Sequence, residues 1–258
     1  MIGIFDSGLG GLTVAREIIK KLPGQPIVYF GDTARTPYGN KGKKTIIKYA
    51  IEDAKFLLQQ GADIIVIGCN TVSAVAAEVL REKFNLPIFD VIEPAVEAAL
   101  RITKNNRIGV IGTRATIASG VYQKKLKIKN LKLKICEAAC PLFVPLAEEG
   151  WVNSPEALAI AKKYLAPLKK AKVDTLILGC THYPFLKPII RRVMGGQVKL
   201  IDSAQAVADK LKDTYPKGQA KKNTFKHKIF FSDLTPFASK VARAWLGNGS
   251  KIKIAPTK

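Results

Sequence analysis

Two cysteines of this 258-residue chain stand at the ends of short apolar runs of nearly the same composition. Cys69 follows the run that begins at Asp63, and Cys180 follows the run that begins at Asp174. Each run continues with apolar and β-branched residues and ends in Gly-Cys, a pattern that predicts a buried parallel strand. Chemistry in open α/β sheets lies at the carboxyl ends of such strands. We therefore expect two thiols, one from each of two similar halves, that can act as acid/base groups on either side of one small ligand.

Hydrogen-bonding residues follow both cysteines. Asn70 and Thr71 come after Cys69, and Thr181 and His182 come after Cys180. A helix that begins at such a position favours the thiolate and is expected to lower the cysteine pKa. His182 can relay a proton or donate to a bound group. A single buried cysteine is usually a small core residue, but two in matched surroundings favour a functional role.

Two loops rich in glycine follow the first two expected strands. The loop Asp6-Ser-Gly-Leu-Gly-Gly-Leu-Thr13 lacks the glycine that a dinucleotide fingerprint would need at Thr13, and no Gly-Lys-Ser/Thr follows. Its backbone N–H groups at a helix start suit a carboxylate, and Asp6 and Ser7 are either functional or helix-capping residues. The segment Gly31–Gly39 contains the turn Pro37-Tyr38-Gly39 and is either a ligand-binding loop or an ordinary connector.

Strand and helix patterns alternate along the chain, which predicts an α/β protein. We expect strands at 2–5, 27–30, 64–68 and 87–91, helices at 12–22, 44–60, 73–84 and 93–101, and a restart of the pattern at 107–113 that echoes 1–7. Later strands are expected at 132–137, 175–179, 199–202 and 228–232, and later helices at 155–171, 188–193, 206–214 and 236–246. The predicted fold is two similar α/β lobes with mostly parallel sheets and an active-site cleft between them. Residues 1–95 with about 206–258 would form the first lobe, carrying Cys69, and residues 96–205 the second, carrying Cys180.

The composition limits the class of protein. With 47% hydrophobic and 24% charged residues the chain is ordinary globular material. It has no apolar run long enough to span a membrane, and its start reads as a strand rather than a signal peptide. Four cysteines do not suggest a disulfide framework, so a cytoplasmic protein with reduced thiols is expected. Cys136 and Cys140 lack the partners of a zinc site, and packing accounts for them.

The formal net charge of +22 raises the question of nucleic acid. In Lys124–Lys134 lysine largely alternates with leucine and isoleucine, which predicts a strand with one solvated face. A second cluster, Lys217–Lys228, reads as a loop. Neither cluster is interleaved with aromatic residues as a single-strand binder would require. We therefore interpret the charge as a solvated basic surface, and the pair Glu148-Glu149 as a solvated turn.

The motifs around Asp6, Asp32, Cys69 and Cys180 occur together in an order that resembles the glutamate racemase family of cofactor-independent bacterial enzymes. The resemblance runs from Ile2 to about Asp202, and Gly-Cys-Thr-His at 179–182 is similar to glutamate rather than aspartate racemases. It implies two-base 1,1-proton transfer. One cysteine thiolate removes the α-proton, and the other, as a thiol, delivers a proton to the opposite face. By the same resemblance Cys69 would act on D-glutamate and Cys180 on L-glutamate.

The resemblance also implies roles for individual residues. Asp6 would assist Cys69, His182 would assist Cys180, and Asp32 and Glu148 match further acidic catalytic positions. The implied substrate contacts are Asp6, Ser7, Tyr38, Gly39, Asn70, Thr71, Thr113, Thr116, Thr181 and His182. No cofactor and no metal is implied. A homodimer in a bacterial cytoplasm that supplies D-glutamate for peptidoglycan is expected. Activation by a peptidoglycan precursor, tied in some members to an extra N-terminal segment, is not expected, because the chain begins directly at the first strand.

Three other functions stay open on the sequence. The protein can be a racemase for aspartate or another amino acid. It can be a cysteine hydrolase that uses Cys180 and His182, although no separate orienting Asn or Asp is recognisable and Cys69 would be unexplained. It can also be a basic nucleic-acid binder, which steeply salt-dependent binding would reveal.

Overall fold

The computed structural model describes residues 1–215, 227–246 and 252–254 and folds them around two parallel sheets. The first sheet has the order β10-β9-β2-β1-β3-β4 and the second the order β6-β5-β7-β8. The strands are β1 (Ile2–Asp6), β2 (Ile27–Gly31), β3 (Ile64–Ile67), β4 (Ile88–Asp90), β5 (Arg107–Gly112), β6 (Lys134–Ala139), β7 (Thr175–Gly179), β8 (Lys199–Asp202), β9 (Lys228–Phe231) and β10 (Ile252–Ile254).

Helices connect the strands and cover both faces of each sheet. The α-helices are α1 (Leu12–Lys21), α2 (Lys43–Gln59), α3 (Asn70–Lys83), α4 (Ile92–Ile102), α5 (Arg114–Ala118), α6 (Val121–Lys129), α7 (Phe143–Glu148), α8 (Pro155–Lys170), α9 (Lys187–Met194), α10 (Ser203–Thr214) and α11 (Pro236–Leu246). Short 3₁₀ helices are η1 (Thr33–Arg35), η2 (Tyr38–Asn40) and η3 (Tyr183–Leu186).

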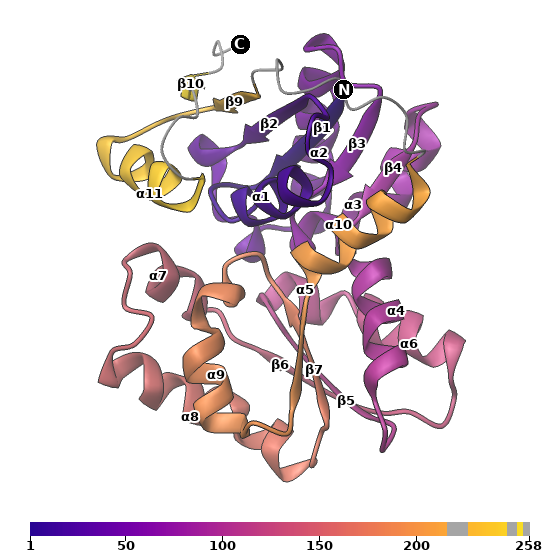
Figure 1. The fold of residues 1–258 in the computed structure, drawn as a ribbon, viewed down its shortest axis with the longest axis vertical. Coiled ribbons are helices and arrows are strands. Elements are labelled where there is room, and N and C mark those ends of the chain that lie inside the picture. Colours follow the sequence, from indigo (N-terminus) through magenta and orange to yellow (C-terminus); the bar gives the residue numbers. More distant parts are fainter. Residues whose placement is uncertain (216–226, 247–251, 255–258) are drawn as a thin grey trace.

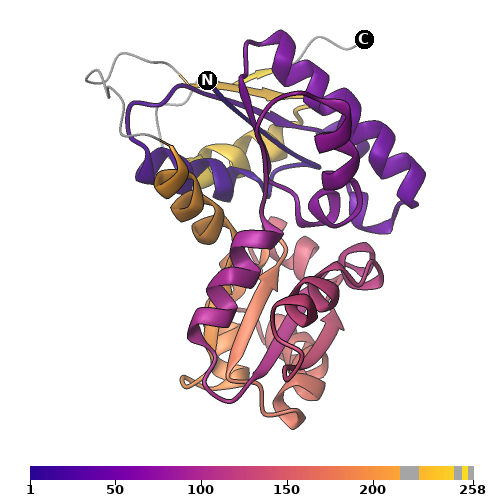
Figure 2. The ribbon, with the colours of Figure 1, turned by 90° about the vertical axis from the view of Figure 1, so that its right-hand side faces the viewer.

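Each sheet is the centre of one lobe, and the two lobes lie one above the other in Figures 1 and 2. In the first lobe β1 lies between β2 and β3, so its side chains are buried on both faces, as its run of apolar residues predicts. Helices α1, α10 and α11 pack on one face of this sheet, and α2 and α3 on the other. In the second lobe α4 and α6 pack on one face, and α7, α8 and α9 on the other.

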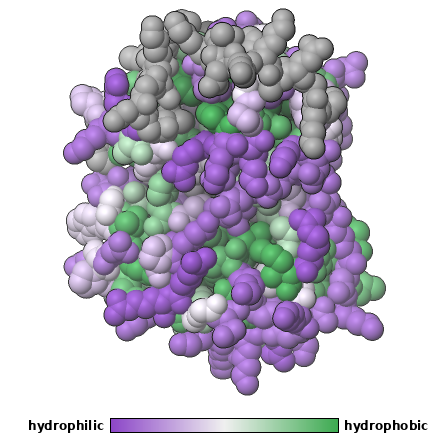
Figure 3. Space-filling model, viewed as in Figure 1, coloured by the Kyte–Doolittle hydropathy of each residue, from purple (hydrophilic) through white to green (hydrophobic). Residues whose placement is uncertain are grey.

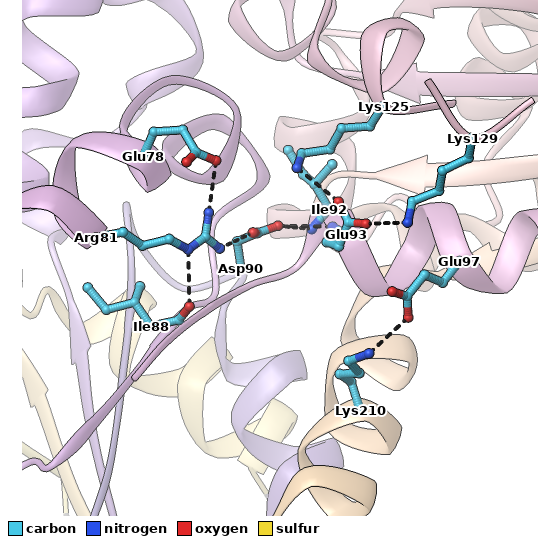
Figure 4. A network of polar contacts seen from close by, with 10 residues as sticks. All are labelled: Glu78, Arg81, Ile88, Asp90, Ile92, Glu93, Glu97, Lys125, Lys129 and Lys210. Carbon is cyan, nitrogen blue, oxygen red and sulfur yellow. Dashed lines mark hydrogen bonds and ion pairs between the residues drawn. The ribbon is translucent and has the colours of Figure 1, made fainter. Parts of the chain in front are cut away.

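The chain crosses between the lobes twice, from β4 into α4 and from β8 into α10. Figure 4 shows the polar network around the first of these crossings. Asp90 ends β4, accepts hydrogen bonds from the first backbone N–H groups of α4, and pairs with Arg81 of α3. Further along α4, Glu93 pairs with two lysines of α6, and Glu97 with Lys210 of α10. Charged side chains thus tie α4 to α6 and α10, and Asp90 at the end of β4 ties the start of α4 to α3. The lobe boundaries at 95/96 and 205/206 stay a prediction.

The α/β fold with two lobes of parallel strands is confirmed, as are several local signals. Ser154 caps α8 by accepting the backbone N–H of Ala157 at 3.1 Å, with Pro155 at the first helical position. Gly61 follows α2 with a φ of +88°, the left-handed conformation that favours glycine.

The prediction of a strand at Lys124–Lys134 is wrong. Residues up to Lys129 belong to α6, and β6 begins only at Lys134. The alternation of lysine with apolar residues misled because Leu126 is buried at helical spacing from Tyr122, while Ile128 and Leu131 are exposed. Of the basic cluster predicted as a loop at 217–228, residues 217–226 lie outside the described residues.

On the face shown in Figure 3, hydrophilic residues predominate, with smaller hydrophobic areas between them. Within the described ranges, no helix combines the length and the apolar character needed to cross a bilayer.

Candidate active site

Cys69 stands at the end of β3, as the N-cap residue of α3. Its thiol donates to the Ser7 hydroxyl, with Sγ and Oγ 3.4 Å apart. Burial raises the Cys69 pKa, and the nearby Asp6 carboxylate raises it further. Hydrogen bonds that the Cys69 thiolate would accept from Ser7 and from the backbone of Val72 act in the opposite direction. The expectation that the helix N-terminus would lower this pKa is therefore wrong for Cys69, because burial outweighs the helix.

Cys180 stands at the end of β7, beside a histidine that is itself held by a carboxylate. The Cys180 Sγ lies 3.8 Å from Nδ1 of His182, and the His182 Nε2 lies 3.0 Å from Oε1 of Glu148. Burial acts to lower the His182 pKa, but the hydrogen bonds to Cys180 and Glu148 outweigh it and raise the pKa to about 10. The imidazole is therefore cationic at neutral pH and can donate to both partners.

The two cysteines line one cavity of about 360 Å³ between the lobes. This volume is in the usual range for small-molecule sites. Of the predicted site residues, the cavity lining brings together Ser7, Tyr38, Gly39, Cys69, Asn70, Thr71, Thr113, Glu148, Cys180, Thr181 and His182. The structure thus places thiols from two matched strand ends, far apart in the sequence, around one ligand-sized space.

The glycine-rich loop of the first lobe presses directly on the Cys180 motif of the second. A Cβ atom on Gly10 would lie 2.2 Å from the Thr181 hydroxyl oxygen and 2.5 Å from the His182 ring. The Thr13 hydroxyl also donates to the backbone carbonyl of Thr181, at 3.2 Å. Glycine is required here for close approach of the two lobes, not for binding a nucleotide.

Asp6 lies outside the cavity lining and is almost completely buried. Its Oδ2 accepts the backbone N–H groups of Gly8 at 3.2 Å and Gly11 at 2.9 Å. Its Oδ1 has no hydrogen-bond partner among the described residues. Asp6 therefore organises the glycine-rich loop and places a negative charge close to the Cys69 sulfur.

Asp32 also lies outside the cavity lining, and it supports Tyr38, which is part of the lining. Its carboxylate accepts hydrogen bonds from Tyr38, Arg35 and Ser232. The Tyr38 hydroxyl also donates to Asp53, at 3.2 Å, and Arg35 pairs with Asp53 at 3.0 Å. Asp32 is thus part of the support of the Tyr38-Gly39 turn.

Hydroxyl groups of three threonines lie close together where α3 of the first lobe meets α5 of the second. Thr71 Oγ1 lies 2.9 Å from Thr113 Oγ1 and 3.4 Å from Thr116 Oγ1, and the last two lie 3.0 Å apart. Thr116 is buried behind Thr113, which caps α5. Asn70 lines the cavity, and its side-chain NH₂ donates to the Tyr122 hydroxyl at 2.9 Å.

The lining also contains residues that the sequence analysis did not single out. These are Thr36, Asn40, Arg114 and an apolar wall of Pro141, Leu142, Val144 and Pro145. The apolar wall comes from the run that precedes Glu148, and Arg114 directly follows Thr113. Proximity to residues already chosen was the only signal for them. Within the part of the chain that the structure describes, no three His, Cys, Asp or Glu side chains are grouped to hold a metal ion.

Fold and site together define a two-lobed α/β protein with a two-thiol cavity between its sheets. Residues 12–211 match the model of the Asp/Glu/Hydantoin racemase family. The chain is 46% identical to the glutamate racemase of Geobacter metallireducens over 249 residues, which cover 95% of this chain and 92% of that protein.

Solved structures agree. Glutamate racemase isoform RacE1 from Bacillus anthracis superposes with a TM-score of 0.95 at 37% identity and covers 100% of this chain and 98% of its own. Glutamate racemase from Francisella tularensis in complex with D-glutamate superposes with a TM-score of 0.92 at 35% identity, over 99% and 97%. The chain belongs to the Asp/Glu/Hydantoin racemase family and is therefore an amino-acid isomerase.

Proposed function

We propose that this enzyme interconverts L- and D-glutamate by moving the α-proton between two cysteine thiols. The observation that carries the proposal is that Cys69 and Cys180 line the same cavity from opposite lobes. Two groups are needed because a single base on one face would mostly return the proton to that face. The similarity to glutamate racemases, one of them solved with D-glutamate, supports glutamate as the substrate.

The different surroundings of the two thiols suit the two halves of the reaction. The raised Cys69 pKa favours the thiol, which is the form that delivers a proton. Cationic His182, 3.8 Å from Cys180, stabilises negative charge on that sulfur, which is the form that removes a proton. In this state Cys180 would remove the α-proton of L-glutamate, and Cys69 would deliver a proton to the opposite face of the α-carbon. The opposite direction exchanges these protonation states.

The proposed reaction uses no cofactor, so the site itself must stabilise the carbanion next to a carboxylate. The backbone N–H groups at the start of α3 and after Cys180 can take part of this charge. The hydroxyl groups of Ser7, Thr71 and Thr113, together with Arg114, can bind the substrate carboxylates. Asp32 and Glu148 then act mainly by holding Tyr38 and His182 in place, and Asp6 acts by holding the glycine-rich loop and by placing negative charge near Cys69. Unchanged turnover after treatment with a chelator and exhaustive dialysis would support the absence of a cofactor.

For the cell, we propose that the product D-glutamate is supplied to peptidoglycan synthesis in a bacterial cytoplasm and that the enzyme acts as a homodimer. Light scattering on the purified chain tests the dimer, and rescue of a D-glutamate auxotroph tests the supply.

The experiment that tests the reaction is incubation with L-glutamate in deuterated water. D-glutamate with deuterium at the α-carbon is expected. Cys69→Ser and Cys180→Ser should each lose roughly 10²–10⁴-fold in kcat, the usual contribution of a positioned acid or base. Cys136→Ser, which changes a thiol outside the cavity, should keep wild-type turnover. Full activity in either cavity variant would contradict the two-thiol mechanism.

The line Cys180–His182–Glu148 would also suit a cysteine hydrolase, since Glu148 orients the histidine as a third group. Cys69 in the same cavity has no part in that chemistry, which favours the racemase. A panel of amides, esters and amino acids, with aspartate included, distinguishes hydrolysis and other racemisations from the proposed reaction.

A further inference from the structure

Tyr122 is a buried tyrosine of the second lobe that no motif singled out. It is the second residue of α6, and 1% of its surface is exposed. Its ring packs in the core with Ile108 and Ile177 of the second sheet. A tyrosine buried to this extent needs a partner for its hydroxyl, and the partner it has lies in the other lobe.

The ring of Tyr122 contacts the backbone that carries Cys180. A Cβ atom on Gly179 would lie 3.2 Å from Cε2 of Tyr122, so the ring rests against the residue that directly precedes the cysteine. Glycine at this position leaves room for the ring and also for the Ile111 carbonyl oxygen of β5, which would lie 2.6 Å from the same Cβ. The position of the ring therefore limits where the end of β7, and with it the Cys180 sulfur, can lie.

The hydroxyl of Tyr122 contacts the residue that directly follows Cys69. It accepts a hydrogen bond from Nδ2 of Asn70, at 2.9 Å. Asn70 is the first residue of α3, and its Oδ1 faces the Ser203 hydroxyl at 3.4 Å. All three residues are buried, so water cannot readily replace these bonds. The Asn70 carboxamide of the first lobe is thus held by Tyr122 and Ser203, which both follow the β4–α4 crossing in the chain.

We propose that Tyr122 is a positioning residue that sets the separation of the two thiols, with its ring against Gly179 and its hydroxyl on Asn70. The proposal rests on the two-thiol reaction proposed above. Proton transfer from one face of a carbon to the other requires both sulfurs at fixed places along one line. A displacement of about 1 Å in such a geometry costs on the order of 10²-fold in rate.

Tyr122→Phe tests this role because it removes the hydroxyl and keeps the ring. We expect kcat to fall about tenfold while KM changes less than about twofold, since the lost bond positions a base rather than the substrate. Because the two enantiomers are equally stable, kcat/KM must fall by the same factor in both directions. Tyr164→Phe, at a second-lobe tyrosine outside the cavity lining, should leave both constants unchanged.

The isotope effect separates positioning from general loss of structure. The hydroxyl acts on the Cys69 side, so the step in which Cys69 removes the proton should slow most. The primary effect with α-deuterated D-glutamate should therefore rise in Tyr122→Phe, and the effect with α-deuterated L-glutamate should not. A variant that is only less stable would show a lower melting temperature and fewer active molecules, with unchanged isotope effects.

A double-mutant cycle tests the path through Asn70. If the hydroxyl acts through Asn70, Tyr122→Phe should cost little further activity in an Asn70→Ala background. Additive losses of activity from Tyr122→Phe and Asn70→Ala would overturn the role of Tyr122. Wild-type kcat and isotope effects in Tyr122→Phe would do the same. In both cases Cys69→Ser and Cys180→Ser would still be inactive, so the proposed function would stand. Wild-type protein that does not racemise glutamate, or activity in the two cysteine variants, would instead overturn the proposed function and this role with it.

Discussion

The difference between the two thiols arises from single side chains around them. Cys69 has the negative charge of Asp6 nearby, while Cys180 has the cationic His182, which Glu148 holds at 3.0 Å. The two thiols thus lie in surroundings of opposite charge. This difference fits the two-base reaction proposed above.

The first prediction at this scale concerns the pH dependence of stability. The His182 pKa is raised from 6.5 to about 10 in the folded protein, so proton binding stabilises the fold. This contribution is fully present below about pH 6.5 and is lost as the pH rises through about 10. In Glu148→Gln the His182 pKa should drop, and the free energy of unfolding at pH 7 should fall below that of the wild type. The difference should shrink towards pH 10.

Urea denaturation at several pH values measures this difference, and NMR follows the imidazole directly because the chain has only two histidines. Glu149→Gln, which removes an exposed neighbouring carboxylate, is the matched control and should change neither quantity. Titration of His182 near its ordinary value of 6.5 in the wild type would contradict the prediction.

At the scale of elements, the loop between β1 and α1 explains why its glycines stand where they do. Gly10 allows the loop to touch the Thr181-His182 segment of the other lobe, and Gly11 makes room for the Asp6 side chain. A loop of this kind resembles a phosphate-binding loop in sequence, because both need backbone that a partner can approach closely. In this fold the partner is the second lobe.

We therefore predict that Gly10→Ala is damaging. Its Cβ would lie 2.2 Å from Thr181 Oγ1, and relief requires movement of the loop or of His182. Overpacking of this kind typically costs about 1–3 kcal/mol of stability, and displacement of His182 should lower kcat by at least about tenfold. Gly42→Ala is the control, because a Cβ there meets no atom of the described structure within 4 Å. Equal kcat and melting temperature in the two variants would refute the close contact.

At the scale of the whole molecule, helix α11 adds a further contact between the lobes. Trp245 of α11, which packs on the first sheet, stacks on Phe185 with ring centroids 4.1 Å apart and meets the His182 ring edge-on at 5.7 Å. The pair Glu97–Lys210 of Figure 4, between α4 and α10, is a polar contact between the lobes. The relative position of the lobes in turn sets the position of the thiols.

The prediction at this scale is that Trp245→Ala lowers kcat/KM by roughly three- to tenfold, since aromatic pairs contribute about 0.5–1.5 kcal/mol beyond burial. Trp151→Ala is the matched control, because Trp151 is 53% exposed and lies outside the two-thiol cavity. Steady-state kinetics of both variants measure the effect. Equal loss in both, or no loss in Trp245→Ala, would show that the contact does not restrain the site.

The sequence predicted the elements that carry the chemistry because their signals are local. The runs before Cys69 and Cys180 are apolar and bounded by Asp and Gly, and both fold as central strands. The strand prediction for Lys124–Lys134 failed because alternation of charged and apolar residues occurs on a strand and also by chance on a helix. Arg114 and the apolar wall of the cavity were missed because only the folded chain brings them to the thiols.

By itself, the sequence determined which groups are available for chemistry: two cysteines at matched strand ends, a histidine after one of them and an aspartate in the first loop. It also determined the order of strands and helices, since this depends on periodicity and caps within each segment. Tertiary structure decided what each group meets, including Glu148 on His182, Asp32 under Tyr38 and Tyr122 between the two cysteine segments. It also reversed the expected pKa shift of Cys69. The physical reason is that burial and contacts between distant segments exist only once the two lobes have packed together.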